Sequence, residues 1–127
     1  MGYLLDTHAV IWLADSPSKI PQKIKDIILM PNNEIYISSI SLWEIAIKMS
    51  IGKLSMDISL NELFNAVENS GFNILHISKE HLLTLSGLPI LHKDPFDRLL
   101  IATALAEGLT IITIDENIQK YEVLWIW

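Results

Sequence analysis

The amino-acid sequence predicts an α/β fold, a three-layer α/β/α domain with a central parallel sheet of four or five strands. Two observations support this class. Short β-branched or aromatic runs alternate with helical patterns along the whole chain, which is typical of a parallel sheet covered by helices on both faces. The chain has 127 residues, 50% of them hydrophobic, and no internal repeat or linker, so we expect one domain spanning residues 1–127.

The first half of the chain predicts two strands and three helices. Thr7 is a candidate cap for the first helix, and Pro21 suits the first turn of the second. Ser39 or Ser41 can cap the third helix, which Gly52 ends. In chain order we expect a strand at residues 3–5, helices at 8–14 and 21–30, a strand at 35–37, and a helix reaching residue 51.

The second half contains stronger helix signals. Ser59 and Glu62 form a capping-box pattern, and Asp94 followed by Pro95 is a strong helix start. Gly108 closes the helix that Asp94 opens. The expected elements are a helix from residue 59 to about 71, a strand at 72–77 with His76 in its second half, a helix at 79–85 capped by Ser78, a helix at 95–107, a strand at 110–114 and an optional fifth strand at 123–127.

The charge balance bears on the class of ligand. A formal net charge of −6 argues against nucleic-acid binding, because nucleic-acid-binding proteins usually present a basic face. The objection weakens if several acids surround divalent cations, since each ion adds positive charge locally.

Nothing in the sequence predicts a membrane span or a signal peptide. No apolar run approaches about 18 residues, and Asp6 interrupts the short apolar start. The chain has no Cys, which suits a reducing cytosol, so we expect a cytoplasmic protein. The mean hydropathy of +0.36 is high for a small soluble monomer and predicts a face covered by a second copy or a partner chain.

Three acids fall at or near positions where α/β sheets bind ligands, beyond the carboxyl ends of the strands. Asp6 ends the first expected strand, and Asp115 directly follows Thr113 and Ile114. Asp97 opens the helix that precedes the fourth strand. In an ideal unit we expect the start of that helix at the opposite edge, so Asp97 joins the others only if the long connection brings it round.

Glu44 stands out because of its neighbours. At helical spacing it shares a face with Ile40, Ile47 and Ile51. A carboxylate in an apolar stripe is costly unless it is paired or binds a metal ion. The alternative is an ion pair with Lys48 one turn later, worth only ~0.3–0.5 kcal/mol.

Each acid also has an ordinary structural explanation. Asp6 could cap the following helix, and Asp94 and Asp97 could act only as a cap and a partner of the helix dipole. Asp115 could form a turn with the residues after it. These explanations suffice for each acid alone, and the joint pattern is what favours a shared site.

Four sequence blocks resemble the PIN-domain family, in that family's order and over nearly the whole chain. They are LLDTH at residues 4–8, SISLWEI at 39–45, HKDPFDR followed by LLIATA at 92–104, and IITID at 111–115. The HKDPFDR block is similar to one branch of the VapC-type toxins, which are ribonucleases of toxin–antitoxin pairs. The resemblance also implies that the connection brings the third acid beside the first.

The resemblance implies that Asp6, Glu44, Asp97 and Asp115 form an acidic quartet binding Mg²⁺ or Mn²⁺. Hard carboxylate oxygens suit these ions. Asp6 and Asp97 would be the principal ligands, and Glu44 and Asp115 would complete the site. The implied activity is endoribonuclease hydrolysis of RNA by a metal-activated water, leaving a 5′-phosphate. The implied partners are RNA, an antitoxin protein and a second copy of the chain.

Other residues are candidates for supporting roles. Thr7 and Thr113 could orient carboxylates, and Asp94 is an additional acid whose role is open. Arg98, Lys48 and Lys93, with Lys53, could hold RNA phosphates or could be ordinary surface charges. For His8 and His92 we expect ordinary side-chain roles, and for Trp12, Trp43, Trp125 and Trp127 we expect packing in preference to base stacking.

Rival functions fit the sequence less well. A receiver-type signalling domain requires a second acid beside Asp6 and a phospho-accepting Asp after the third strand, and the chain has neither. A haloacid-dehalogenase-like phosphatase requires an acid at position 8, which is His8. The five glycines form no phosphate-binding loop. A PIN-like protein that only binds a partner stays open.

Overall fold

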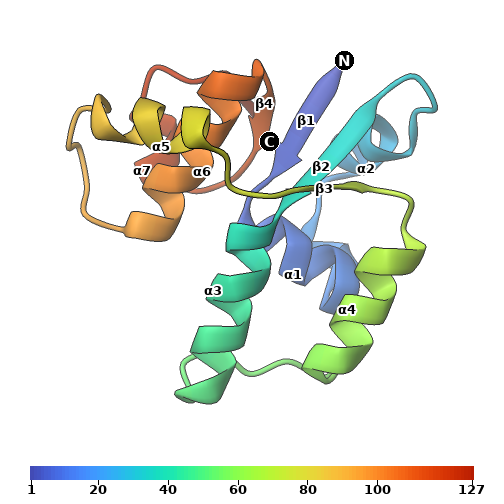
Figure 1. The fold of residues 1–127 in the computed structure, drawn as a ribbon. Helices are drawn as coiled ribbons and strands as arrows, with labels where there is room; N and C mark the ends of the chain where they lie inside the picture. The colour runs from blue at the N-terminus through green and yellow to red at the C-terminus, as the bar shows by residue number, and fades with distance from the viewer.

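The computed structural model of the protein describes all residues 1–127, and a five-stranded sheet lies at its centre (Figure 1). Every neighbouring pair of strands is parallel, and the spatial order is β3-β2-β1-β4-β5. The predicted α/β class is therefore confirmed, with the fifth strand present. The strands are β1 (Gly2–Leu5), β2 (Glu34–Ser38), β3 (Asn73–Leu75), β4 (Thr110–Ile112) and β5 (Trp125–Ile126).

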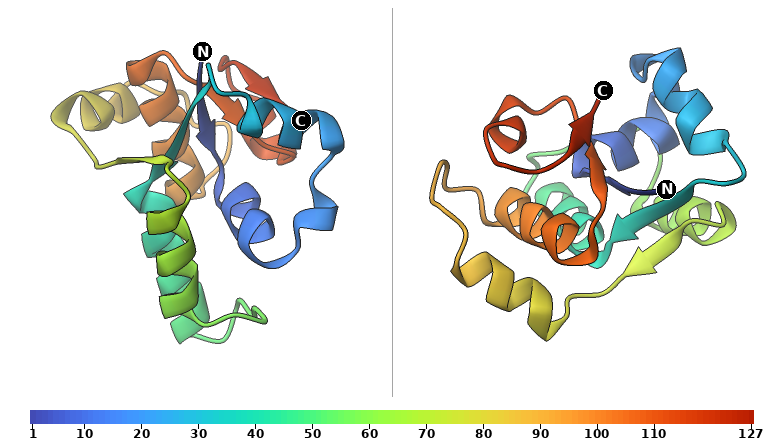
Figure 2. Two further views of the ribbon diagram at one scale, coloured as in Figure 1. Left: turned by 90° about the vertical axis from the view of Figure 1, so that its right-hand side faces the viewer. Right: turned by 90° about the horizontal axis from the view of Figure 1, so that it is seen from above.

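Helices cover both faces of the sheet (Figures 1 and 2). They are α1 (Thr7–Asp15), the 3₁₀ turn η1 (Pro17–Lys19), α2 (Gln22–Leu29), α3 (Ser39–Ser50), α4 (Leu60–Asn69), α5 (Lys79–Ser86), α6 (Pro95–Glu107) and α7 (Glu116–Gln119). The helices α1, α2 and α4 pack on one face, and α6 packs on the other with α5 beside it. No helix combines the length and the apolarity needed to cross a membrane.

The core divides into two clusters because side chains alternate along each strand. Leu5 and Ile112 belong to the cluster beneath α1, α2 and α4, whereas Leu4 and Ile111 pack with Leu100 of α6. All five side chains are fully buried. A strand buried on both faces requires a continuous apolar run, which is the pattern of β1 and β4.

The strand ends differ from the prediction because a strand ends where its neighbouring strand ends and backbone pairing stops. Ser38 pairs with Leu75, and β2 then turns directly into α3, so β3 ends there and His76 lies beyond it. Leu5 pairs with Ile112, and β1 then gives way to α1, so β4 ends at residue 112. The fifth strand is shorter than predicted for the same reason.

Two predicted caps were wrong by a few residues, and two short elements were not predicted. The cap of α1 is not Thr7 but Asp6, whose Oδ1 accepts from Ala9 N, so the capping role that we considered for Asp6 is confirmed. The cap of α3 is Ser38, whose hydroxyl accepts from Ile40 N, and not Ser39 or Ser41. In both places the chain leaves the sheet and enters the helix at once. The short elements η1 and α7 were missed because each holds fewer than five residues.

Gly108 is the residue whose backbone the fold most clearly constrains. It ends α6 with φ 68° and ψ 36°, a left-handed conformation that residues with a Cβ rarely adopt. We expect Gly108→Ala to lower the free energy of unfolding by about 1 kcal/mol, measured by urea denaturation. Gly87→Ala is the matched control, because Gly87 also ends a helix but has φ −96°. Equal losses in both variants would contradict the explanation.

Candidate active site and metal centre

The site candidates lie where the strand order reverses. The chain adds β2 and β3 on one side of β1 and then returns to add β4 on the other side. In open α/β sheets, ligands bind in the crevice that this reversal leaves beyond the carboxyl ends of the strands. Asp6 follows β1 immediately, and Asp115 lies three residues beyond β4. Both side chains are therefore at the edge where a ligand is expected.

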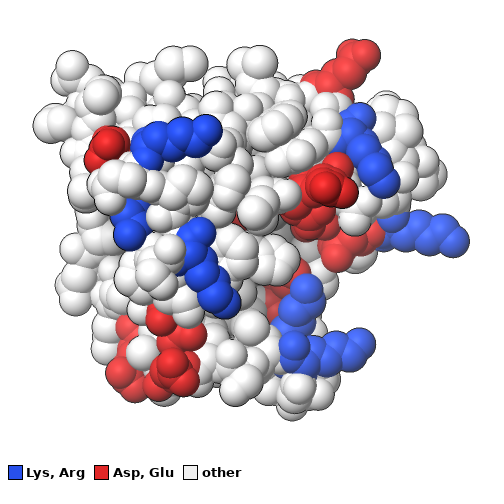
Figure 3. Space-filling view, turned by 180° about the vertical axis from the view of Figure 1, so that it is seen from behind, with Lys and Arg blue, Asp and Glu red and all other residues white.

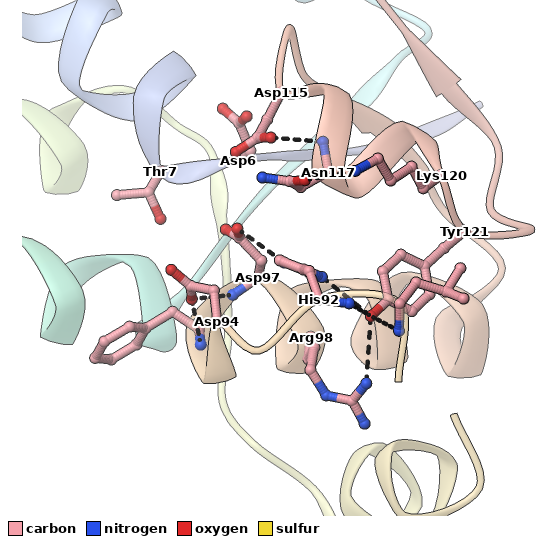
Figure 4. Close-up of polar contacts among 12 residues, drawn as sticks. Asp6, Thr7, His92, Asp94, Asp97, Arg98, Asp115, Asn117, Lys120 and Tyr121 are labelled. Atoms are coloured by element: carbon pink, nitrogen blue, oxygen red, sulfur yellow. Dashed lines mark hydrogen bonds and ion pairs between the residues drawn. The ribbon is translucent and has the colours of Figure 1, made fainter. Parts of the chain in front are cut away.

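Asp97 reaches the same edge without any detour, so the opposite-edge expectation was wrong. The helix α6 delivers the chain to the amino end of β4 through Gly108, and a helix that ends at the amino edge begins at the carboxyl edge. Figure 4 shows the Asp97 carboxylate pointing toward the side on which Asp6 and Asp115 lie. Glu44, in the second turn of α3, also follows directly from a strand's carboxyl end.

Asp6 is buried, with 2% of its surface exposed, and the protein holds both of its oxygens. Oδ1 accepts from Ala9 N at 2.7 Å, and Oδ2 accepts from the Thr113 hydroxyl at 2.5 Å. The Thr113 hydroxyl in turn accepts from Asp115 N at 2.9 Å. Burial is the main cause that raises the pKa of Asp6, and the Asp115 charge raises it further, against the lowering effect of these hydrogen bonds.

Glu44 is 4% exposed and has partners on both oxygens. Oε1 accepts from the Thr7 hydroxyl at 2.7 Å, and Oε2 accepts from Lys48 Nζ. Ser41 Oγ lies 3.1 Å from the Thr7 hydroxyl, whose single proton goes to Glu44, so Ser41 is the donor in that contact. The ion pair that we considered as an alternative explanation for Glu44 is thus present. Thr7, which we named as a residue that could orient a carboxylate, also holds Glu44, and the contribution of Ser41 was not predicted.

Asp97 and Asp94 begin α6 with different roles. Asp94 Oδ1 caps the helix by accepting from Phe96 N and Asp97 N. Asp97 Oδ2 accepts from His92 Nε2 at 3.2 Å, and Oδ1 accepts no hydrogen bond from the protein. Burial, followed by the charges of Asp94, Asp115 and Glu44, raises the pKa of Asp97 to about 6, against the lowering effect of the His92 hydrogen bond.

The four acids of the predicted quartet are close enough to repel one another. The charge of Asp115 raises the pKa of Asp6, and the charges of Asp115 and Glu44 raise the pKa of Asp97. Lys48 lies among them, and its pKa is raised chiefly by the hydrogen bond to Glu44 and also by the charges of Asp94 and Asp97. The result is a concentrated negative charge that one lysine only partly offsets.

The donor set fits a hard divalent cation, although it is not a finished ligand cage. No three His, Asp or Glu side chains are arranged as a ready-made metal site. Mg²⁺ retains several waters and needs only one or two carboxylates, so a loose cluster of carboxylates suits it better than it would suit Zn²⁺. Asp97 Oδ1 has no protein donor, and the carboxylate points toward Asp6 and Asp115, so this oxygen is well placed to bind such an ion.

The candidate phosphate-binding residues are placed differently from one another. Arg98 extends away from the carboxylates (Figure 4) and donates to the carbonyls of Pro89 and Leu88 and to the Tyr121 hydroxyl. Lys48 lies beside the acids, and Lys93 is exposed just before α6. The face seen in Figure 3 carries acidic and basic side chains interspersed, with no continuous basic surface.

Aromatic side chains near the site pack against other aromatic rings. Trp43, next to Glu44, is 56% exposed and lies edge-on to Phe96 with ring centroids 5.3 Å apart. Trp12 packs against Trp127 at 5.7 Å. Tyr121 is buried and touches the site through His92, and no sequence signal pointed to it, because it stands alone after α7.

Comparison with known proteins identifies the family. Residues 3–124 match the PIN domain, and the chain belongs to the PIN-domain family. No curated protein matches the sequence. The sequence-based resemblance to this family is therefore confirmed.

Several solved structures share the fold. The structure is similar to VapBC2 from Rickettsia felis bound to a DNA fragment from their promoter, with 20% identity, a TM-score of 0.77, and coverage of 100% of this chain and 99% of that chain. It is also similar to FitAcB from Neisseria gonorrhoeae, with 20% identity, a TM-score of 0.68, and coverage of 98% and 96%. A third similar structure is DNA-bound VapBC from Salmonella typhimurium, with 19% identity, a TM-score of 0.68, and coverage of 100% of this chain and 97% of that chain.

The raised pKa of Asp97 predicts how the metal-free protein responds to pH. An acid whose pKa is higher in the folded than in the unfolded chain destabilises the folded state above that pKa, and the penalty disappears as the pH falls from about 6 toward 3.8. We expect Asp97→Asn to raise the free energy of unfolding of the metal-free protein at pH 7.5 by on the order of 1 kcal/mol, allowing for solvent screening. Urea denaturation in EDTA at pH 7.5 and pH 4 measures the effect.

Most of the gain should disappear at pH 4, where wild-type Asp97 is protonated in the folded chain and the pH is close to its unfolded pKa of 3.8. Asp57→Asn, at an exposed acid in the loop before α4, is the control and should leave stability unchanged at both pH values. An Asp97→Asn protein that is less stable than wild type at pH 7.5 would contradict the repulsion that we describe.

Proposed function

We propose that this protein is a Mg²⁺- or Mn²⁺-dependent endoribonuclease and the toxin of a toxin–antitoxin pair, acting in the cytoplasm. The observation that carries the proposal is the convergence of Asp6, Glu44, Asp97 and Asp115 beyond the carboxyl ends of β1 and β4, where each lies within electrostatic reach of another. Membership of the PIN-domain family supports it. Such a concentration of charge destabilises the metal-free protein and requires a reason other than stability.

In this proposal Asp6 and Asp97 are the principal metal ligands, and Glu44 and Asp115 complete the site directly or through waters. A bound Mg²⁺ or Mn²⁺ would supply Lewis acidity at the scissile phosphate. It would also lower the pKa of a water molecule, so that the water is a better nucleophile near neutral pH. No side chain of the chain then has to act as the nucleophile.

The chain's own residues orient these carboxylates. Thr113 joins Asp6 to the backbone of Asp115, so the two acids from neighbouring strands keep one relative position. Thr7 holds Glu44 from α1. Hydroxyl groups serve this purpose well because they donate to a carboxylate without adding positive charge that would compete with the ion.

Lys48 is the best candidate for holding an RNA phosphate. Its ammonium group binds Glu44 of the acidic cluster, and the side chain is 37% exposed. A phosphate drawn to the metal ion would come within reach of it, and Lys93 would extend the contact along the backbone. Arg98, whose guanidinium is engaged with the connection before α6, is better explained as a structural residue.

The proposed antitoxin contact is supported by an apolar cavity on the α1, α2 and α4 side of the sheet. Its volume is about 390 Å³, and its lining includes Val10, Leu13, Ile28, Val67 and Phe72. The similar structures from Rickettsia felis and Salmonella typhimurium were solved as VapBC complexes. An apolar antitoxin segment in this cavity, and a homodimer through exposed Leu82, Leu83 and Ile90 at and after α5, would account for the high mean hydropathy.

An RNA cleavage assay tests the chemistry. We expect purified wild-type protein to cleave single-stranded RNA with Mg²⁺ or Mn²⁺ and to lose activity in EDTA. Asp6→Asn and Asp97→Asn should each lower kcat by at least about 100-fold, because an amide oxygen binds a hard cation far more weakly than a carboxylate does. Cleavage is read on a labelled RNA by gel electrophoresis.

Two controls make the result interpretable. Asp57→Asn removes a carboxylate outside the cluster and should keep wild-type activity, which excludes an effect of net charge. Isothermal titration with Mn²⁺ should show binding to wild type and to Asp57→Asn only. Equal cleavage by all four proteins would show that a contaminating nuclease is responsible and would end the proposal.

A further inference from the structure

Tyr121 is a buried tyrosine whose hydroxyl lies at the centre of a polar network next to the acidic cluster. It is 4% exposed and follows α7. Its oxygen is 3.1 Å from Leu91 N, 3.2 Å from His92 N and 3.2 Å from Arg98 Nη1, all of which are donors (Figure 4). A fourth contact joins the same oxygen to His92 Nδ1 at 3.0 Å.

The direction of the fourth hydrogen bond follows from counting protons. A phenolic oxygen has one proton and two lone pairs. Three N–H groups already compete for the two lone pairs, so no acceptor capacity remains for a proton on His92 Nδ1. The Tyr121 hydroxyl must therefore donate to Nδ1, which is then the unprotonated nitrogen of the ring.

The other ring nitrogen points to the acidic cluster. His92 Nε2 lies 3.2 Å from Asp97 Oδ2, and a carboxylate oxygen can only accept. Nε2 therefore carries the proton, in agreement with an Nδ1 that accepts from Tyr121. The two contacts require the same tautomer, and the chain of donors runs from the Tyr121 hydroxyl through the His92 ring to Asp97.

We infer that Tyr121 and His92 are positioning residues for Asp97, the hydroxyl setting the tautomer and orientation of the ring, and the ring holding Oδ2 so that Oδ1 stays free for the divalent cation. This inference rests on the function proposed above. It concerns residues outside the acidic quartet, and it gives the buried tyrosine a role at the metal centre.

Asp97 needs such a donor more than its neighbours do. Its charge is opposed by Asp94, Asp115 and Glu44, and rotation about χ1 would carry the carboxylate away from them. Asp6 and Glu44 are each held by partners on both oxygens, whereas Asp97 is held by His92 alone. Loss of a side chain that hydrogen-bonds to a metal ligand typically weakens metal affinity by about 10- to 100-fold.

A purely structural role would have Tyr121 only tie residues 88–92 to the start of α6. The tautomer of His92 separates the two roles, because packing alone does not select it. Nitrogen-15 NMR of the metal-free protein, with long-range correlations to the ring protons, should show His92 protonated at Nε2 and bare at Nδ1. Tyr121→Phe keeps the edge-to-face contact of the ring with His92, at 5.4 Å between centroids, and should lose that single tautomer.

Metal binding and kinetics provide the second readout. We expect Tyr121→Phe and His92→Asn to weaken Mn²⁺ binding about 10-fold and to lower kcat with little change in KM for RNA. His92→Gln should recover most of the Mn²⁺ affinity and most of kcat. The glutamine amide reaches the position of Nε2, whereas the asparagine amide reaches only that of Nδ1. Tyr36→Phe, which removes a hydroxyl bound to Glu34 elsewhere on the sheet, is the matched control and should behave as wild type.

The outcomes separate this inference from the proposed function. A wild-type protein that neither binds Mn²⁺ nor cleaves RNA would overturn both. If wild type binds and cleaves, the positioning role is overturned by an Nδ1-protonated His92, by a Tyr121→Phe protein with unchanged affinity, or by His92→Gln and His92→Asn proteins that are equally impaired. The His92 pair decides the question if Tyr121→Phe does not fold.

Discussion

Mutual repulsion among carboxylates at one edge of the sheet is the constraint on which the rest of the site depends. The fold brings Asp6, Glu44, Asp97 and Asp115 together because parallel strands end at one edge and the helices that follow or precede them start there. Helix starts also make the arrangement tolerable. Asp6 and Asp115 cap α1 and α7, and Asp97 lies in the first turn of α6, where backbone N–H groups and the helix dipole favour negative charge.

Capping and metal binding are therefore not competing explanations for these acids. A cap uses one oxygen of the carboxylate to hold its position and leaves lone pairs on the other for a ligand. Asp6 illustrates this, since Oδ1 caps α1 while Oδ2 accepts a hydrogen bond from the Thr113 hydroxyl and remains near Asp115. A residue whose capping role is a sufficient structural explanation can thus also bind a metal ion, because the cap fixes the position of its carboxylate.

The sequence predicted the parts of the fold that are encoded locally. Alternating strand and helix patterns, the Ser59 capping box, the Asp94 start and the Gly108 stop all proved correct. Strand lengths were overestimated because the end of β3 depends on where β2 becomes α3, which is a property of the partner strand. The quartet came from matching four separated blocks to one family. Tyr121 could not be found in this way, because its role depends on the three residues that its hydroxyl contacts in space, Leu91, His92 and Arg98.

The direction in which each carboxylate points gives the assignment that spacing along the chain leaves open. Asp94 and Asp97 are three residues apart in the same block, and either could be chosen from the sequence as the metal ligand. Asp94 Oδ1 is committed to two backbone N–H groups of α6, and the residue contributes to the site mainly through its charge. Asp97 receives one donor, from a ring whose tautomer is set by a buried hydroxyl, and turns its unpartnered oxygen toward the other acids. Each residue keeps one oxygen without a protein donor, so the difference between them is one of direction: the Asp97 carboxylate points toward Asp6 and Asp115, whereas Asp94 Oδ1 is turned to the backbone of α6.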